Sequence, residues 1–292
     1  MENNCKVTKY KKSTGNSNLS LYGMACITVV PEENPTSTNR ACLVAFTKPT
    51  TLIIEGDGYF TDETLTQNLG KTMSYTSIVG GGLTVYLSNN ATYKLYIDKY
   101  KVKMLNTRAA SHGKIVNFND FDYADSIDDL ETPGNWNSEG SVDEVFKKNN
   151  LVFFNGSNTK VGLNLANAAG CTLLQKLECG VDFNNIGERG KNVTGSIESL
   201  VNCTALISLN LNSQINVNGV LETLLAGMCA NRTSGTLVYN GFKTQCTFHD
   251  TLDLISLYCT FSNDGVVVKQ NSQSGTLLGT YTKATSTWTY PE

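Results

Sequence analysis

The spacing of apolar residues within residues 195–219 (GSIESLVNCTALISLNLNSQINVNG) constrains the fold of this chain more than any other feature. Apolar residues recur there at every third position and then after two, at Ile197, Leu200, Cys203, Leu206, Leu209 and Leu211. A threefold spacing suits a short helix or an arc of turns, and the closing Leu-x-Leu is typical of the inward face of a short strand. One such unit cannot bury its own apolar edge, so the pattern predicts neighbouring copies that stack on it.

Two neighbouring segments carry the same spacing. The upstream copy matches position for position, 32 residues earlier, at Leu165, Ala168, Cys171, Leu174, Leu177 and Cys179. The downstream copy restarts at Leu221 and Leu224, continues two residues late at Cys229, and ends at Leu237 and Tyr239. Two partial copies retain the strand alone, at Leu151 and Phe153 and at Leu254, Leu257 and Cys259.

These copies predict a solenoid of parallel strands, with Leu177, Leu209 and Leu237 in one internal column. Ordinary amphipathic segments that happen to contain leucine are the alternative interpretation. Between the first two units, residues 182–191 exceed the length that a regular unit needs, which predicts a protruding loop there.

Residues 1–125 have a different sequence pattern, in which apolar runs alternate with turn residues. Short strands are expected at residues 24–30, 41–46, 51–54, 83–87, 93–97 and 102–105. Such spacing predicts an antiparallel β-sandwich or barrel, with residues 83–87 and 93–97 as its clearest hairpin.

Residues 126–150 read as an acidic, turn-rich linker before a repeat domain at residues 151–292. Six carboxylates lie within residues 120–131, and a calcium site is the alternative to a solvated linker, although their order does not match a calcium-binding loop. Ser141 and Glu144 favour a capped helix over residues 141–148.

The C-terminal residues alternate as strands at 265–269, 275–281 and 287–290, which predicts a β cap that covers the end of the solenoid. Trp288 and Tyr290 share one face of the last strand. Packing in the cap is the favoured role for these two rings, and a stacking platform for a sugar or a partner is the alternative.

Composition excludes several classes of function. A net charge of -3 leaves no basic excess for a dedicated nucleic-acid binder. No stretch approaches the roughly 18 uninterrupted apolar residues of a membrane-spanning helix, and the polar, basic start is not a secretory signal.

The sequence has nine cysteines, which is an odd number, and no export signal is expected. Both points argue against a disulfide framework, so most of the cysteines are expected to be buried thiols. Cys171, Cys203 and Cys229 fall at equivalent repeat positions, where packing explains them. A metal site is the alternative role for three residues that could act as ligands, Cys246, His249 and Cys259, but a fourth ligand is not evident. Neither a metal nor another cofactor is therefore expected.

Catalytic motifs are missing from the sequence. It contains no nucleophile elbow, no phosphate-binding glycine loop and no zinc-protease helix, and its imidazoles are His112 and His249. The protein is therefore expected not to be an enzyme; a glycosidase with a pair of carboxylates, which has no sequence signature, stays as the alternative.

Four segments resemble virion proteins of tailed phages of gut Bacteroidetes, including the crAss-like group. They are KVTKYKKSTGNSNLSLYGMACITV, GDGYFTDETLTQNLGKT with LTVYLSNNATYKLYI, GSIESLVNCTALISLNL and DGVVVKQNSQSGTLLGTYTKATSTWTY. The resemblance implies an N-terminal β domain joined to leucine-rich repeats, in a head fibre, capsid decoration or tail fibre. It also implies a virion location, other capsid or tail subunits as partners, and a homo-oligomer such as a trimer. Gln214 departs from the Asn or Cys that many leucine-rich repeats keep.

The expected binding residues lie in two segments. The N-terminal arm has a local positive excess at Lys6, Lys9, Lys11 and Lys12, and we expect this arm to dock onto another subunit. The protruding loop offers Phe183 and Arg189. A role in adhesion, with the repeats bound to a host glycan or surface protein, is the alternative to a purely structural role.

Overall fold

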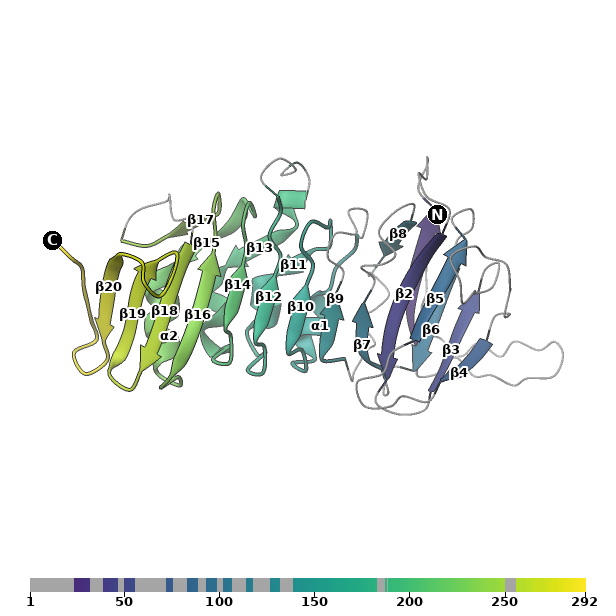
Figure 1. The fold of residues 1–292 in the computed structure, drawn as a ribbon, viewed down its shortest axis with the longest axis horizontal. Helices are drawn as coiled ribbons and strands as arrows, with labels where there is room; N and C mark the ends of the chain where they lie inside the picture. The colour runs from purple at the N-terminus through teal and green to yellow at the C-terminus, as the bar shows by residue number, and fades with distance from the viewer. Residues whose placement is uncertain are drawn as a thin grey trace. The chain divides into compact units, whose positions relative to one another are not determined.

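The computed structural model describes the backbone of eight strands within residues 24–117, and the whole of residues 127–131, 139–182, 187, 189–249 and 256–292. The described fold is mainly β, as the sequence predicts (Figure 1). The chain divides into two units, Met1–Val145 and Phe146–Glu292.

The first unit contains two sets of hydrogen-bonded strands. Its elements are β1 (Met24–Pro31), β2 (Asn39–Phe46), β3 (Thr50–Glu55), β4 (Thr72–Tyr75), β5 (Leu83–Ser88), β6 (Tyr93–Asp98), β7 (Val102–Asn106), β8 (Lys114–Asn117) and β9 (Asp129–Glu131), followed by helix α1 (Asp143–Lys147) at the boundary. One set has the order β4-β3-β6-β1-β8 and is antiparallel. The other has the order β5-β2-β7-β9, in which β7 and β9 are parallel.

All six strands predicted for residues 1–125 are present, and β4 and β8 are additional. The predicted hairpin is wrong, because β5 pairs with β2, whereas β6 pairs with β1 and β3. A short polar turn between two strands does not oblige them to pair when each finds a partner elsewhere in the chain. The closure of these strands into a sandwich or barrel stays a prediction.

Residues 126–150 contain β9 and α1. The predicted helix is confirmed, and the Asp143 N–H donates to Ser141 Oγ at 3.1 Å, which supports its first turn. Leu130 and Phe146 are completely buried, so the prediction of a solvated linker is wrong at these positions.

The second unit alternates strands of two sheets with short helices. Its elements are β10 (Phe153–Asn155), β11 (Leu163–Asn164), η2 (Leu165–Ala168), β12 (Lys176–Glu178), η4 (Arg189–Lys191), β13 (Val193–Ser196), η5 (Ile197–Asn202), β14 (Ser208–Asn210), β15 (Asn216–Val220), α2 (Leu221–Cys229), β16 (Gly235–Asn240), β17 (Gln245–Thr247), β18 (Ser256–Ser262), β19 (Gly265–Gln270), β20 (Leu277–Thr282) and β21 (Thr287–Thr289). β10, β12, β14 and β16 pair in parallel, and so do β11, β13, β15 and β17. β18 to β21 extend the first of these sheets in antiparallel order.

The parallel strands place buried side chains in one internal column. Phe154, Leu177, Leu209 and Tyr239 occupy paired positions, and none is more than 1% exposed. The predicted column is confirmed for the two leucines. It is wrong for Leu237, which lies two residues before the paired position.

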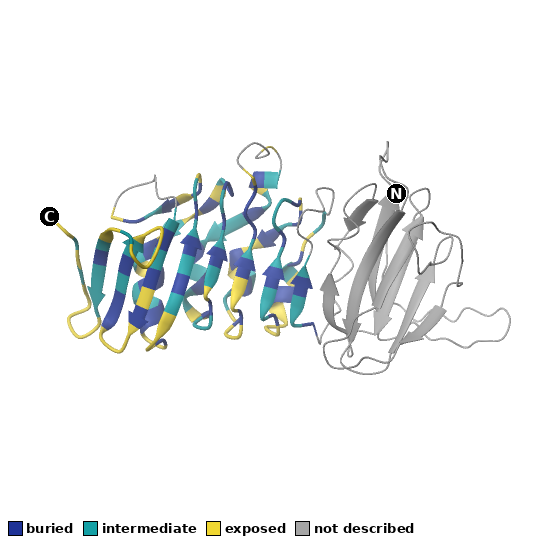
Figure 2. Cartoon of the chain, viewed as in Figure 1, coloured by how far each residue is buried: buried dark blue, intermediate teal, exposed yellow. Residues whose placement is uncertain are grey.

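The threefold spacing corresponds to short helices that lie between the strands of the two sheets. Every one of its positions in the first two copies is buried, as Figure 2 shows for the interior of this unit. η2 and η5 are 3₁₀ helices, in which three residues complete a turn, so side chains three apart face the core together. The corresponding α2 is an α-helix with 3.6 residues per turn. This difference explains why Cys229 comes two residues late.

The two partial copies need correction. At the first, the buried residue is Phe154, and the predicted Phe153 lies on the opposite face of β10. At the second, Leu257 and Cys259 are buried, but β18 is antiparallel to β16, so this segment is not another parallel unit. Leu254 lies outside the described residues.

Candidate binding surface

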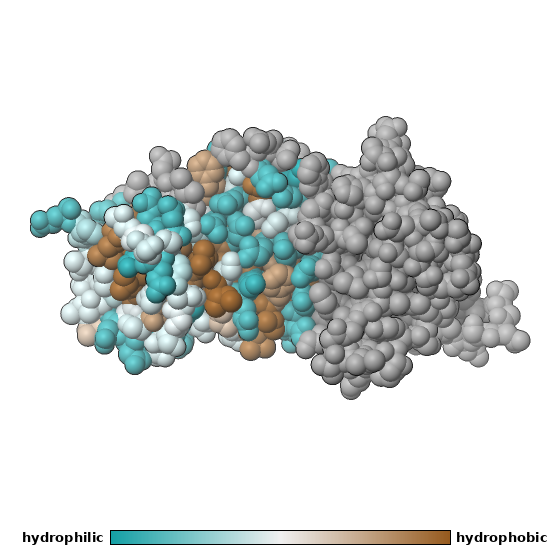
Figure 3. All heavy atoms as spheres, in the orientation of Figure 1, coloured by the Kyte–Doolittle hydropathy of each residue, from teal (hydrophilic) through white to brown (hydrophobic). Residues whose placement is uncertain are grey.

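The outward positions of β16 and β18 to β21 form a surface of mostly uncharged side chains. Buried and outward residues alternate along these strands, so each outward side chain lies beside those of the neighbouring strands. The outward positions are Thr236, Val238 and Asn240 in β16, Ser256, Tyr258, Thr260 and Ser262 in β18, Val267 and Lys269 in β19, Leu277, Thr280 and Thr282 in β20, and Thr287 and Thr289 in β21. Figure 3, which views this face of the second unit, shows hydrophobic and hydrophilic residues interspersed.

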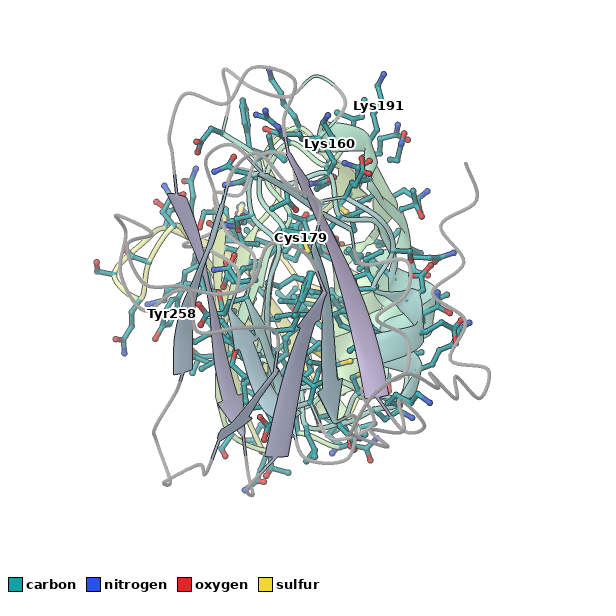
Figure 4. All side chains as sticks on the ribbon, turned by 90° about the vertical axis from the view of Figure 1, so that its right-hand side faces the viewer. Lys160, Cys179, Lys191 and Tyr258 are labelled. Carbon is teal, nitrogen blue, oxygen red and sulfur yellow. The ribbon has the colours of Figure 1, made fainter. Side chains whose placement is uncertain are left out.

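Tyr258 is the aromatic residue among these outward positions. It is half-buried and lies between Val238 and Lys269, which are its paired residues on the two adjacent strands. Figure 4 shows Tyr258 at the outer side of the sheet, away from the interior where Cys179 lies. The ring therefore has aliphatic neighbours on both sides and an outward phenol.

Polar groups surround this ring. Thr236, Thr260 and Asn240 occupy the diagonal and adjacent outward positions. Among the described residues, no hydrogen bond engages the amide of Asn240 or the phenol of Tyr258. These groups can therefore donate and accept hydrogen bonds to a molecule that lies on the sheet.

Charge is sparse on the same surface. Lys269 is the charged residue among the outward positions of β16 and β18 to β21, and its ammonium donates to the Gln273 carbonyl at 2.8 Å. Glu178, on the more distant β12, accepts a 2.5 Å hydrogen bond from Ser208 Oγ. The surface around Tyr258 thus favours an uncharged ligand over a strongly ionic one.

Trp288 and Tyr290 lie on the other face of β21, toward the core. Phe248, which is only 2% exposed, has its ring edge-on to both, with centroid distances of 5.5 and 6.1 Å. Tyr281 lies beside Trp288 at 5.5 Å. The favoured interpretation, packing of these rings at the end of the core, agrees with this geometry.

Tyr290 is also fixed on two further sides. Its hydroxyl donates to Glu222 Oε1 of α2 at 3.1 Å, and its ring stacks on His249 at 3.8 Å. The same Glu222 oxygen accepts the His249 backbone N–H. These contacts leave the face of Tyr290 toward His249 covered, which argues against a sugar platform on that face.

Most of the predicted binding residues lie outside the described residues. They are Lys6, Lys9, Lys11, Lys12 and Phe183. Arg189 is described and half-buried in η4, and its carbonyl accepts a 3.3 Å hydrogen bond from Gln214 Nε2. The prediction of a protruding loop at residues 182–191 is therefore wrong in its C-terminal part. There Gly190 is buried in η4, and its carbonyl accepts the Ile215 N–H at 2.8 Å.

Gln214 links its own repeat to the preceding repeat of the same unit. It is only 2% exposed, and its amide donates to the Cys179 carbonyl at 2.7 Å and accepts the Val193 N–H at 3.3 Å. Thr159 and Thr244 follow the corresponding left-handed turn residues in other units, and each bonds to a carbonyl three residues before it at 2.7 Å. The longer glutamine reaches a second unit, which a threonine cannot do.

The described cysteines are free, buried thiols. Burial raises the pKa of Cys171 to about 11 and that of Cys203 to about 12. Their thiols donate to the carbonyls of Phe146 and Ala168 at 3.2 and 3.3 Å. A raised pKa keeps a thiol protonated and unreactive near neutral pH, so these positions offer no nucleophile.

Cys246 is buried and its pKa is raised by burial, whereas the neighbouring His249 is exposed. Within the described ranges, no three His, Cys, Asp or Glu side chains gather closely enough to hold a metal ion. The acidic cluster at residues 120–131 lies partly outside these ranges, so the calcium alternative stays open there. Among the described helices, none has the length and apolar character needed to cross a membrane.

Sequence reasoning did not single out Tyr258, Thr236, Thr260 or Asn240. The alternation of SLYCTFS in β18 identifies Tyr258 and Thr260 as one face of a strand, but it does not say which face is outward. Their neighbours on β16 come from a separate unit, and only the pairing of β16 with β18 brings the four together.

Comparison of the whole chain with models of known protein families and with curated proteins finds no match. The candidate surface therefore rests on the geometry described above.

Proposed function

We propose that this protein is a non-enzymatic structural component of a phage particle, as a head fibre, capsid decoration or tail fibre. In this proposal the N-terminal region attaches to the particle, and a leucine-rich-repeat solenoid with a C-terminal β cap is displayed. The observation that carries the proposal is the parallel, in-register column of Phe154, Leu177, Leu209 and Tyr239.

The column supports a display role through its geometry. A stack in which each unit contacts its neighbours buries one continuous core and presents a broad, regular outer face. Antiparallel strands and the rings of Phe248, Trp288 and Tyr290 cover the end of this core. Such a domain needs no catalytic group to function as a spacer or an adhesive surface.

Attachment is assigned to residues 1–125 on the basis of the sequence. The lysine-containing arm and the β strands would contact other capsid or tail subunits, and several copies, for instance three, would assemble together. The resemblance to Bacteroidetes phage virion proteins supports this assignment.

Mass spectrometry of particles purified by density gradient tests the proposed location. We expect peptides of this protein to co-purify with the particles in a fixed ratio to the major capsid protein. Deletion of residues 1–20 should lower this ratio if the arm is the anchor, whereas deletion of the repeat region should not. Absence of the full-length protein from intact particles would contradict the proposal.

A second function, adhesion to a surface molecule of the host, is favoured by the outward Tyr258 and its polar neighbours. It is compatible with the first, because a displayed virion protein can also bind a receptor. Purified protein that binds host cells independently of other virion proteins would support it.

A further inference from the structure

We propose that the outer face of the second unit binds a neutral carbohydrate, with a sugar ring stacked on Tyr258. This inference deepens the display half of the proposed function and rests on it, since it assigns the ligand that the displayed face would contact.

The position of the Tyr258 ring favours stacking of a sugar. Tyr258 lies in the middle of β18, between the aliphatic Val238 and the methylene chain of Lys269. Side chains at directly paired positions have Cβ atoms about 4.5–5.5 Å apart, so these neighbours hold the phenol on both sides. An aromatic ring supported in this way offers an apolar, ordered surface to the C–H face of a pyranose.

The polar groups around the Tyr258 ring can bind the hydroxyls of a sugar. Thr236 and Thr260 are paired with each other, and Asn240 is paired with Ser256, so hydroxyls and an amide flank Tyr258 on two sides. Hydroxyl and amide groups both donate and accept hydrogen bonds, as the hydroxyls of a sugar do. The row that starts at Thr236 and Thr260 passes Val267 of β19 and continues through Thr280 and Thr289, with adjacent strands about 4.8 Å apart, which provides hydroxyls to further residues of a linear glycan.

The low charge of this face favours a neutral ligand. Among the outward positions of β16 and β18 to β21, the sole ion is Lys269, and its ammonium already donates to the Gln273 carbonyl. An acidic polysaccharide would gain little there, because it requires several cations at the surface. A neutral glycan matches this surface.

The composition also argues against a protein partner. The centre of a protein interface is typically a cluster of large apolar and aromatic side chains with a polar rim. Here the one aromatic ring has Val238 and Lys269 beside it and threonine, serine and asparagine around them. The valines of β16 and β19 are separated from each other by Tyr258 and Thr260, and the exposed Leu277 lies beside Lys269, one strand away from Tyr258's neighbours on β19.

The test uses the full-length protein and an array of immobilised oligosaccharides. The array carries neutral oligomannosides, oligoglucosides and oligogalactosides, together with acidic oligogalacturonides. We expect binding to at least one neutral series, and the dissociation constant for that oligosaccharide is then measured by calorimetry. Tyr258→Ala should weaken this binding by about tenfold or more, as loss of a central aromatic anchor does.

Two variants make the result specific. Tyr258→Phe keeps the ring and should bind within about threefold of the original protein, because stacking is retained and one hydroxyl is lost. Phe153→Ala removes another half-buried aromatic side chain from the outward face of the same sheet and should leave binding unchanged. Melting curves check that all three variants are folded.

Several outcomes would overturn the inference. They are the absence of binding to every neutral series, unchanged affinity of a folded Tyr258→Ala variant, and binding confined to the acidic oligosaccharides. Loss of particle incorporation in Tyr258→Ala without any glycan binding would identify the face as a contact between subunits and would also contradict it. Mass spectrometry of particles stays an independent readout, so a failed glycan site and a failed virion assignment are distinguishable.

Discussion

The second unit contains two regions that build one sheet in different ways. From β10 to β16, each strand pairs in parallel with a strand from the next copy of the repeat. From β18 to β21, each strand pairs antiparallel with the next strand in the sequence, after a short turn. The first region takes its stability from contacts that are distant in the sequence, and the second from local hairpins.

This difference explains why the parallel repeats are easier to recognise in the sequence than the antiparallel strands that follow them. A parallel stack repeats the same environment at fixed intervals, so similar residues recur at equivalent positions. An antiparallel region requires only that alternate residues face the core, which many sequences satisfy. The repeat is therefore recognisable in the sequence up to Tyr239, and alternation of buried and outward residues is the signal after it.

Arg232 joins the two regions. Its guanidinium donates to the carbonyls of Leu206 at 2.5 Å and Thr236 at 2.6 Å, and it lies 4.2 Å from the ring centroid of Phe261 on β18. Burial lowers the pKa of Arg232, but an arginine stays protonated, and the carbonyls compensate for its lost hydration. Arg232 thus links the segment before β14 with β16 and β18, on the two sides of the strand where the pairing changes direction.

The largest effect is expected from a charge inside the parallel region. Leu209→Asp would bury a carboxylate without a partner, because the position is completely buried, and should destabilise the protein by roughly 3–5 kcal/mol. Urea unfolding followed by circular dichroism measures this loss. Ile207→Asp is the matched control, since Ile207 immediately precedes β14 and is 42% exposed, so that a carboxylate there stays hydrated. A Leu209→Asp variant that unfolds at the original urea concentration would refute the internal column.

The next largest effect on stability is expected from raising the pH, because of the buried thiols of the parallel region. Below about pH 8.5 a cysteine is protonated in both the folded and the unfolded protein; above it the unfolded thiol ionises. The folded thiols of Cys171 and Cys203 keep their protons until about pH 11 and 12. Stability should therefore fall as pH rises above 8.5, by about 1 kcal/mol for each thiol at pH 9.5. The double variant Cys171→Ala/Cys203→Ala should show a smaller fall between pH 7.5 and 9.5, and an equal fall would exclude these thiols as its cause.

Gln214 provides a sharper test of contacts between units. Gln214→Leu removes hydrogen bonds to Cys179 and Val193 and should cost about 1–3 kcal/mol. Gln214→Thr should recover part of the lost stability, because the hydroxyls of Thr159 and Thr244 donate a hydrogen bond to a carbonyl within their own turns. Amide exchange at Val193 should accelerate in both variants. Equal stability of the leucine variant and the original protein would show that the bridge between units is dispensable.

The smallest loss of stability is expected from substitutions in the antiparallel region. Tyr290→Phe keeps the aromatic packing on Phe248 and removes the hydrogen bond to Glu222, so it should cost about 0.5–1.5 kcal/mol. Trp288→Ala uncovers part of the Phe248 ring and should cost more. Thermal unfolding of the two variants ranks them. The reverse order would mean that the hydroxyl, rather than ring packing, holds the last strand.

The buried residues of the repeats, and the parallel direction of their strands, could be predicted from the sequence alone. The threefold spacing with a closing Leu-x-Leu is a direct consequence of 3₁₀ turns followed by a short strand, so Ile197, Leu200, Cys203, Leu206 and Leu209 could be assigned without a structure. The six predicted N-terminal strands follow from local alternation in the same way.

The choice of partner for each strand, and the set of residues that meet on the surface, could not be predicted in this way, because both depend on the folded chain. β5 and β6 are adjacent in the sequence, yet each prefers a different neighbour, because pairing depends on the whole set of available edges. Tyr239 displaces Leu237 from the column because α2 has more residues per turn than the preceding 3₁₀ helices, and the segment that follows it is also longer. Tyr258 acquires its polar neighbours in the same way. Local propensity acts on each segment separately, whereas register and surface are properties of pairs of segments that only the folded chain brings together.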